Sequence, residues 1–330
     1  MTEREELLSL DLEESDYLYR IRRGKRVIYV SVLDTYIVPP NDRTEGSRIL
    51  SHLRRLPGWD GGWRTLTARR KDGAVECTVD EFMPHRLDGR SVAACVGRRF
   101  DVVELERRGR ISERVARVVV EGVVCVAKIA RFRHELEALE REVRVYGALR
   151  DRGFGLAPGF VGYVYEEEEE RVIGFLMEEL QGRHPGVGDL RACGEAVEKL
   201  HGVGVVHGDL NRYNIIIRGN VAKLIDFEVV TFLEDGHHVE AKDELRKLAE
   251  ELLDTSEGFQ NHEPCELNTV ELANPSVCNK LSHQGPAEGL YEAEPTGFHL
   301  LFCMKLSMGI QGAKGTSIRH AMHISPSTQW

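Results

Sequence analysis

The central part of the chain changes from a strand-like to a helix-like pattern of hydrophobic positions. Residues 124–129 form a run of apolar, mainly β-branched side chains with one lysine, which predicts a buried strand. Residues 133–150 are rich in Glu, Leu, Ala and Arg, and their apolar positions recur every three or four residues. This second pattern predicts an amphipathic helix directly after the strand.

Short apolar runs further along the chain predict two more strands, a helix and a hairpin. Residues 160–165 and 172–176 are expected to pair as strands, with the acidic run 166–170 as a solvent-exposed hairpin tip. Apolar residues between 190 and 200 recur with helical spacing, which predicts a helix. Residues 215–225 are expected to form a hairpin around an Arg-Gly-Asn turn.

The two ends of the chain have weaker patterns. Near the start we predict a strand at 26–33 and a hairpin at 66–79, with Trp59 and Trp63 filling a small core. After a last amphipathic helix at 243–253 the periodicity is lost and Ser, Asn, Pro and Gly accumulate, which predicts poor order. We therefore divide the chain into three parts: an N-terminal β-rich extension (1–95), a central domain (96–254) and a C-terminal tail (255–330).

The charge of the chain argues against one class of partner. Its 330 residues include 44 basic and 54 acidic side chains, a net charge of −10, so broad nucleic-acid binding is not expected. A short basic patch lies at Arg20, Arg22, Arg23, Lys25 and Arg26. We interpret it as a solvated strand end, with a localisation signal as the less favoured alternative.

Cysteine usage and hydropathy favour the cytosol. Seven cysteines are scattered without a Cys-x-x-Cys pair, which predicts reduced thiols, and Cys125 and Cys193 fall on apolar faces. The first thirty residues lack the apolar segment of a signal peptide, and the apolar stretch 298–310 is too short to span a bilayer. We expect a cytoplasmic protein without a membrane partner, with the nucleus as an alternative location.

The most informative segment is 207–226, which reads HGDLNRYNIIIRGNVAKLID. Asp209 is followed five positions later by an amide, Asn214, and twelve positions after that by a second carboxylate, Asp226. One carboxylate in such a loop orients an attacking hydroxyl group, while the amide and the other carboxylate hold Mg²⁺ beside a phosphoryl group. The spacing therefore favours a phosphotransferase, with His207 supporting the loop.

This segment resembles the catalytic loop, H-x-D-x-x-x-x-N, and the following D-F-G motif of the protein-kinase-like superfamily. The resemblance implies an α+β, bilobal protein-kinase-like fold. Its N-lobe (96–180) would be an antiparallel sheet with one helix, and its C-lobe (181–254) would be mainly helical and shortened. The resemblance also implies ATP and Mg²⁺ as cofactors, with Asp209 and Asn214 as catalytic residues and Asn214 and Asp226 as metal ligands.

The same resemblance assigns a lysine and a hinge. Lys128, in the run Val-Ala-Lys, matches the lysine that binds the phosphates, and Glu142 best matches the glutamate that holds this lysine. Met-Glu-Glu-Leu resembles the hinge, where backbone groups of Glu178 and Leu180 would meet the adenine edge. Three neighbouring glutamates remain as alternatives to Glu142: Glu135, Glu137 and Glu140.

The phosphate-covering loop is the least complete match. We place its two strands at 101–105 and 114–120, which leaves 106–113 as the connection. Gly109 is the only glycine there, so Gly109 and Ser112 are the candidate phosphate-binding positions. An ordinary hairpin turn is the alternative interpretation.

Three positions depart from the protein-kinase pattern. Gly208 replaces an arginine, Asn211 replaces a lysine, and the D-F-G motif ends in Glu228 with no A-P-E segment after it. The motifs H-G-D-L and D-F-E are closer to those of aminoglycoside phosphotransferases and choline kinases. The run 171–178 (RVIGFLME), followed after a spacer by HGDLNRYN and LIDFE, resembles a group of uncharacterised fungal kinase-like proteins more closely still. The resemblance covers residues 95–254.

Together these features predict an ATP- and Mg²⁺-dependent phosphotransferase that transfers the γ-phosphoryl group to a hydroxyl acceptor. A small-molecule acceptor is favoured over a protein, because Gly208, Asn211 and the missing A-P-E segment all depart from the protein-kinase pattern. The alternative is an inactive nucleotide-binding or scaffolding module, which the glycine-poor loop and the short C-lobe favour.

Overall fold

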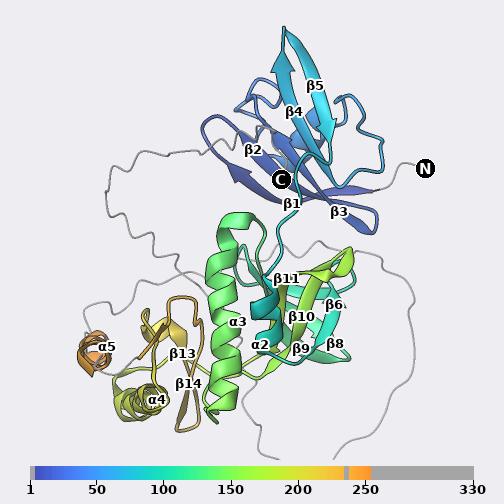
Figure 1. The fold of residues 1–330 in the computed structure, drawn as a ribbon. Helices are drawn as coiled ribbons and strands as arrows, with labels where there is room; N and C mark the ends of the chain where they lie inside the picture. The colour runs from blue at the N-terminus through green and yellow to red at the C-terminus, as the bar shows by residue number, and fades with distance from the viewer. Residues whose placement is uncertain (1–3, 234–237, 254–330) are drawn as a thin grey trace, which may run out of the picture.

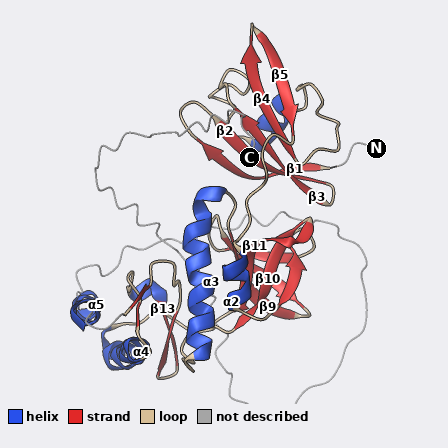
Figure 2. Ribbon diagram, viewed as in Figure 1, coloured by secondary structure: helices blue, strands red, loops and turns tan. Residues whose placement is uncertain are grey.

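A computed structural model describes residues 4–233 and 238–253. Two β-sheets lie one above the other, and α3 separates the lower sheet from a smaller group of helices and hairpins (Figure 1). Helices α4 and α5 lie on the far side of that group, while most of the strands lie in the two sheets (Figure 2). The predicted tail at 255–330 falls outside the described residues.

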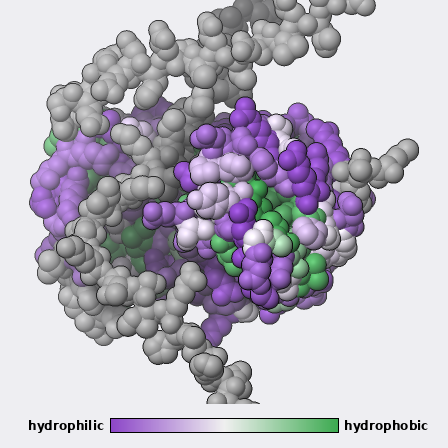
Figure 3. Space-filling model, turned by 90° about the horizontal axis from the view of Figure 1, so that it is seen from above, coloured by the Kyte–Doolittle hydropathy of each residue, from purple (hydrophilic) through white to green (hydrophobic). Residues whose placement is uncertain are grey.

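The upper sheet, called here the N-terminal sheet, has the strand order β1-β2-β3-β4-β5. The strands predicted at 26–33 and 66–79 are confirmed, whereas the first two strands were not foreseen. From above, an apolar area surrounded by hydrophilic side chains is visible on this part of the molecule (Figure 3). The elements are β1 (Glu5–Leu12), β2 (Tyr17–Arg23), β3 (Arg26–Val32), α1 (Gly46–Leu53), β4 (Thr65–Lys71) and β5 (Ala74–Val79).

The two tryptophans lie in the core of the N-terminal sheet, as predicted. Trp59 and Trp63 are buried and meet edge to face, with their ring centroids 5.6 Å apart. The guanidinium carbon of Arg23 lies 4.5 Å from the Trp59 centroid and 4.8 Å from that of Trp63, a double cation–π contact. The prediction that the basic patch is solvated is therefore wrong for Arg23, and also for Arg20, which is buried.

The lower sheet has the strand order β6-β10-β11-β9-β8-β7 and all its neighbouring strands are antiparallel except β6 and β10. Its outer face packs against the N-terminal sheet through a shared core that includes Val27, Tyr29, Val118 and Ile173. Its strands are β6 (Arg98–Asp101), β7 (Glu106–Arg110), β8 (Val115–Val120), β9 (Val123–Ile129), β10 (Phe160–Glu166) and β11 (Glu168–Glu178).

The strand predicted at 101–105 is wrong. Strand β6 ends at Asp101, whose carboxylate accepts a hydrogen bond from the backbone N–H of Val103 (2.8 Å), while its carbonyl accepts one from the N–H of Leu105 (3.2 Å). These bonds bend the chain into a turn. The residues expected to form a loop, 106–110, are strand β7 instead.

The prediction of a solvent-exposed acidic tip at 166–170 is also wrong for its first residue, Glu166. Glu166 is fully buried, and the turn lies at Glu167, which has a positive φ of 61°. The Glu166 carboxylate accepts hydrogen bonds from Arg20 Nε (2.7 Å) and from the Tyr29 hydroxyl (2.8 Å), and it pairs with Arg171. Arg20 and Tyr29 belong to the N-terminal sheet, so this network joins the two sheets.

The predicted helix at 133–150 is confirmed as the short 3₁₀ turn η1 (Arg133–Glu135) followed by α3 (Leu136–Asp151). Helix α2 (Gly89–Ala94) packs closely on α3, because a Cβ at Gly147 would lie 2.4 Å from the carbonyl oxygen of Ala94. Because α2 packs on α3, some residues before 96 already pack beside the lower sheet. The boundary at residue 95 stays a prediction.

The remaining part contains the predicted hairpin and helices. Apolar faces of α4 and α5 meet the β13–β14 hairpin and the α3 side of the lower sheet in one core. With the lower sheet and α3, this group forms an α+β, bilobal protein-kinase-like fold. No helix among the described residues is both long and apolar enough to cross a bilayer. Its elements are η2 (Val187–Asp189), α4 (Leu190–Gly202), β12 (Val205–Val206), η3 (Arg212–Asn214), β13 (Ile215–Arg218), β14 (Val221–Leu224), β15 (Thr231–Phe232) and α5 (His238–Leu253).

Candidate active site

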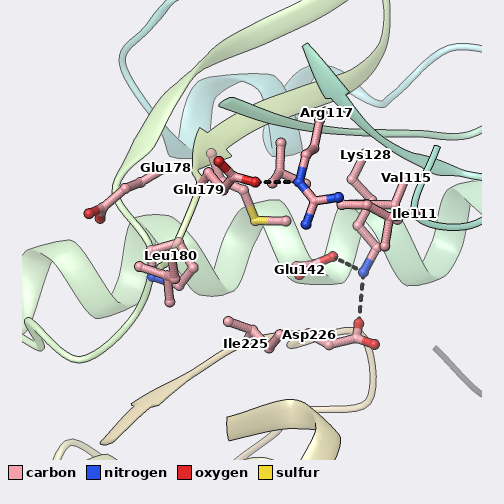
Figure 4. A pocket seen from close by; sticks show the side chains of 13 residues that line it. Ile111, Val115, Arg117, Lys128, Glu142, Glu178, Glu179, Leu180, Ile225 and Asp226 are labelled. Atoms are coloured by element: carbon pink, nitrogen blue, oxygen red, sulfur yellow. Dashed lines mark hydrogen bonds and ion pairs between the residues drawn. The ribbon is translucent and has the colours of Figure 1, made fainter. Parts of the chain in front are cut away.

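Lys128 lies in β9 and points from the lower sheet towards α3, where three carboxylates surround it. Its Nζ atom lies 2.7 Å from Glu142 Oε2 and 2.7 Å from Asp226 Oδ1 (Figure 4). It also lies 3.0 Å from Glu228 Oε1. The structure thus pairs Lys128 with Glu142. The three alternative glutamates have other partners: Glu135 pairs with Arg131, Glu137 with Arg141, and Glu140 accepts a hydrogen bond from the N–H of Asp88.

The pKa values of this cluster reflect a competition between burial and charge. Burial alone would lower the pKa of Lys128, but the three carboxylates outweigh it and raise this pKa. Burial raises the pKa of Glu142 to about 7, although Lys128 acts in the opposite direction. Burial also acts to raise the pKa of Asp226, but the nearby Lys128 outweighs this effect and lowers it. Lys128 and Asp226 are therefore charged at neutral pH, whereas burial favours the protonated form of Glu142.

The catalytic-loop residues meet next to this cluster. The amide nitrogen of Asn214 donates to the backbone carbonyl of Asp209 (2.7 Å) and more weakly to its carboxylate (3.3 Å). The backbone N–H of Ile225 donates to the Asn214 carbonyl (3.0 Å), which brings the end of β14, and hence Asp226, beside the loop. The Asn214 amide oxygen accepts no hydrogen bond from any residue in the described ranges, so it is available as a ligand.

His207 supports the loop from below, as the sequence indicated. It is buried, and its Nε2 atom lies 2.9 Å from the carbonyl oxygen of Ile225. Its ring packs on Phe227 with the centroids 5.2 Å apart. Burial lowers the pKa of His207, so the imidazole is neutral at pH 7.

Gly208 is required by the local backbone conformation, in addition to its place in the motif. Its φ angle is +81°, and a Cβ atom there would lie 2.4 Å from the carbonyl oxygen of Val229. Neither an arginine nor an alanine fits this backbone without a shift.

Glu244 holds this loop in place, a contact that was not foreseen from the sequence. One oxygen of its carboxylate accepts the backbone N–H of Gly208 (2.7 Å), and the other accepts the N–H of His207 (3.2 Å) and lies 2.7 Å from His201 Nε2. Glu244 therefore anchors the catalytic loop to α5. Its position on the same helical stripe as the buried Leu248 indicates burial, but not which loop it contacts.

A pocket opens between the two lobes, directly beside Lys128 (Figure 4). Apolar side chains form its walls, among them Val115, Val126, Met177 and Ile225. Glu178 and Leu180 line it at the hinge.

Backbone hydrogen bonding differs between the two hinge positions. The Glu178 N–H already donates to the carbonyl of Gly159 (2.8 Å). Leu180 forms no backbone hydrogen bond with the described residues, so both of its polar groups are available to a ligand. An ion pair between Arg117 and Glu179, not foreseen from the sequence, crosses the pocket mouth.

Gly109 and Ser112 do not line this pocket. They border a different cavity, on the outer face of the lower sheet. At the tip between β7 and β8, the N–H groups of Ile111 and Ser112 both donate to the carbonyl of Val115 (2.9 and 3.0 Å). The tip therefore has the hydrogen bonding of an ordinary hairpin turn, which was the alternative interpretation.

Comparison with known proteins gives partial similarities, and no family model matches the chain. A "probable bifunctional tRNA threonylcarbamoyladenosine biosynthesis protein" of Methanoculleus marisnigri is 40% identical over 72 residues, 22% of this chain and 13% of that protein. A protein of the same name from Methanothermobacter thermautotrophicus is 42% identical over 65 residues, 18% of this chain and 12% of that protein.

A third similarity is to the KEOPS complex subunit Bud32 of Pyrococcus abyssi, which is 31% identical over 102 residues, 28% of this chain and 44% of that protein. The chain thus spans less than half the length of each of these relatives. None of the three tests the resemblance to fungal proteins, which stays a prediction. Together with the bilobal fold, these partial similarities support a place for this chain in the protein-kinase-like superfamily.

Proposed function

We propose that the chain is an ATP- and Mg²⁺-dependent phosphotransferase whose acceptor is a hydroxyl group. The observation that carries the proposal is the position of Lys128, held by Glu142 and Asp226 at the inner end of an apolar pocket between two lobes. Apolar walls suit the adenine base, and a fixed cation suits the phosphates.

The residues around Asp226 fit a magnesium ion. Asp226 offers a carboxylate oxygen and Asn214 an amide oxygen, and Mg²⁺ prefers such hard oxygen donors. The hydrogen bond from Asn214 Nδ2 to Asp209 fixes the orientation of the amide, which leaves its oxygen for the ion. Mg²⁺ held by these two residues would neutralise negative charge on the transferring phosphoryl group.

The protein side chains would then act in defined roles. Lys128 would exchange its contacts with Asp226 and Glu228 for phosphate oxygens, while its pair with Glu142 keeps it in place. Asp209 is exposed, and it would accept the hydrogen bond of the acceptor hydroxyl and then its proton. We propose a small-molecule acceptor, supported by Gly208 and Asn211, at positions where protein kinases carry arginine and lysine.

A second candidate is a nucleotide-binding module without turnover. It is favoured by the β7–β8 tip, where the N–H groups of Ile111 and Ser112 are used within the turn and not free for phosphates. It is also favoured by Glu228, whose carboxylate forms an ion pair with Lys128 in this structure.

We further propose that the protein works in a reducing compartment such as the cytoplasm. Cys95, Cys125 and Cys193 are buried and unpaired in the structure, and such thiols persist where disulfides are not formed.

The test combines nucleotide binding with turnover. A ligand at about 100 times its Kd stabilises the native state by roughly 2.7 kcal/mol, so Mg-ATP should raise the thermal unfolding midpoint of the wild type. We expect this rise to require Mg²⁺ and to vanish in Asp226→Ala, whereas Asp209→Asn should keep the rise and lose phosphoryl transfer. A rise in the wild type and in Asp209→Asn, without phosphoryl transfer by the wild type, would favour the second candidate. No rise in the wild type would refute both candidate functions.

A further inference from the structure

A groove separates the N-terminal sheet from the edge of the lower sheet, on the side opposite the nucleotide pocket. Its larger part has a volume of about 370 Å³ and continues into a smaller part of about 100 Å³, with Leu8, Val102, Leu105 and Arg107 shared between them. The floor of the larger part is apolar and consists of Leu8, Val102, Leu105, Val118, Ala127 and Ile129.

The rim of the groove carries a surplus of positive charge. The Arg107 guanidinium makes no hydrogen bond or ion pair with any residue that the structure describes, and it lies beside Arg20 and Arg22. Partial burial and these two neighbouring guanidinium groups lower the pKa of Arg107. Glu6 is the only carboxylate that lines the smaller part.

The paired arginines nearby do not remove this surplus. Arg20 and Arg171 share the single carboxylate of Glu166, while Arg108 and Arg110 are each paired with one glutamate. The molecule as a whole has a net charge of −10, so this positive region is opposite in sign to the rest of the chain. It suits an anionic partner.

The groove also borders a free sheet edge. Strand β7, with the sequence Glu-Arg-Arg-Gly-Arg, is the last strand of the lower sheet, and among the described residues no strand pairs with its outer side. The register of its pairing with β8 shifts between Arg107 and Gly109. An edge strand presents unpaired N–H and C=O groups that another extended chain can bind.

We propose that this groove binds an extended acidic peptide segment of a partner protein, which adds to the sheet along β7. The peptide backbone would pair with the outer side of β7. Side chains alternate between the two faces of an extended chain, so only every second side chain would enter the groove, where both Arg107 and Leu105 lie. Along that face, carboxylates would reach Arg107 and apolar side chains would cover the floor around Leu105. A free edge and an apolar floor together fit a peptide better than a small anion, which would use only the arginine.

The test uses a fluorescein-labelled peptide with the repeat Glu-Ser-Val-Ser, which places glutamate and valine on the same face of an extended chain, and binding is followed by fluorescence anisotropy. We expect saturable binding to the full-length protein and a loss of at least tenfold in affinity in Arg107→Glu. The control Arg90→Glu changes the charge equally at an exposed arginine of α2 outside the groove, and it should leave the affinity unchanged. Arg107→Gln, which changes the charge less, should give a smaller loss in the same direction.

Other occupants give different results. A peptide with N-methylated alternate residues cannot complete strand pairing, so its affinity should fall at least tenfold; equal affinity would overturn the strand addition. Equal competition by citrate or inorganic phosphate would show a small-anion site, and self-association that Arg107→Glu abolishes would show a second copy as the occupant. No saturation at about 1 mM peptide, which corresponds to a binding free energy near −4.1 kcal/mol, would also overturn the proposal.

Discussion

At the scale of single residues, the titration of Glu142 makes the stability of the folded protein depend on pH. Its pKa in the folded protein is about 7, raised from 4.5 by burial. Between these values the folded state holds a proton that the unfolded state has released, so this contribution to stability is complete below 4.5 and is lost as the pH rises through 7. We expect the unfolding free energy of the wild type, relative to Glu142→Gln, to fall between pH 5 and 7 by up to about 1.4 kcal/mol per pH unit.

Urea unfolding of both proteins at several pH values measures this difference directly. The comparison with Glu142→Gln cancels the titration of groups that both proteins share, including the buried His207. A difference that stays constant from pH 5 to 8 would contradict the raised pKa.

Gly208 allows a matched test of backbone strain. A residue other than glycine in the left-handed region costs about 1–2 kcal/mol, and at Gly208 the added Cβ would also meet the carbonyl of Val229 at 2.4 Å. We expect Gly208→Ala to destabilise the protein by more than about 2 kcal/mol. Gly219→Ala is the control, since Gly219 also has a positive φ (59°) but no atom within 4 Å of its Cβ position. Equal losses in chemical denaturation would show that the contact with Val229 has no effect.

The sequence showed those site residues that lie close together in the chain. Asp209, Asn214 and Asp226 fall within eighteen residues of one another, and the hairpin between them follows from local patterns. Glu244 was missed because its role depends on how α5 docks against the loop, and periodicity alone cannot show a docking partner. The choice of Glu142 among four glutamates needed the resemblance, because a helix pattern places several of them within reach of a strand.

At the scale of elements, the β10–β11 hairpin depends on one buried carboxylate. Removing one partner of a buried ion pair leaves an uncompensated charge and typically costs about 3–5 kcal/mol. Glu166→Gln leaves Arg20 and Arg171 without their shared carboxylate, so we expect a loss of that size in urea unfolding. Glu170→Gln, on the exposed part of the same hairpin, should change stability by less than about 0.5 kcal/mol. Similar effects of the two substitutions would contradict the role of the buried network.

Errors in the predicted elements have the same origin. A run of five glutamates usually lies in solvent, and the sequence gives no sign that two arginines, one of them almost 150 residues earlier, would bury the first of them. Strand β7 was taken for a loop because three of its five residues are arginines, a composition that suits an edge strand as well as a connection. Strands β8, β9 and β11 were recognised because burial on the sheet gives them continuous apolar runs.

At the scale of the whole molecule, the N-terminal sheet is bound to the lower sheet and not merely attached by a linker. The two sheets share the apolar core around Val27 and Tyr29 and the ion-pair network of Glu166. We predicted a domain boundary at residue 95 because the kinase-like motifs begin after it. Contacts between segments far apart in sequence, such as that of Arg20 with Glu166, produce no periodic pattern of residues, so they could not be predicted.

This shared interface predicts that the two sheets unfold together. Trp59 and Trp63 report on the N-terminal sheet by fluorescence, while far-ultraviolet circular dichroism reports mainly on helices such as α3 and α4. A Trp330→Phe background removes the third tryptophan of the chain. We expect the two probes to give the same urea midpoint in this background, because opening one sheet exposes the core of the other. Glu166→Gln, which weakens the interface, should separate the two midpoints, with the tryptophan signal changing first. Different midpoints already in the background protein would mean that the interface does not couple the sheets, and the N-terminal sheet would then be an independent folding unit.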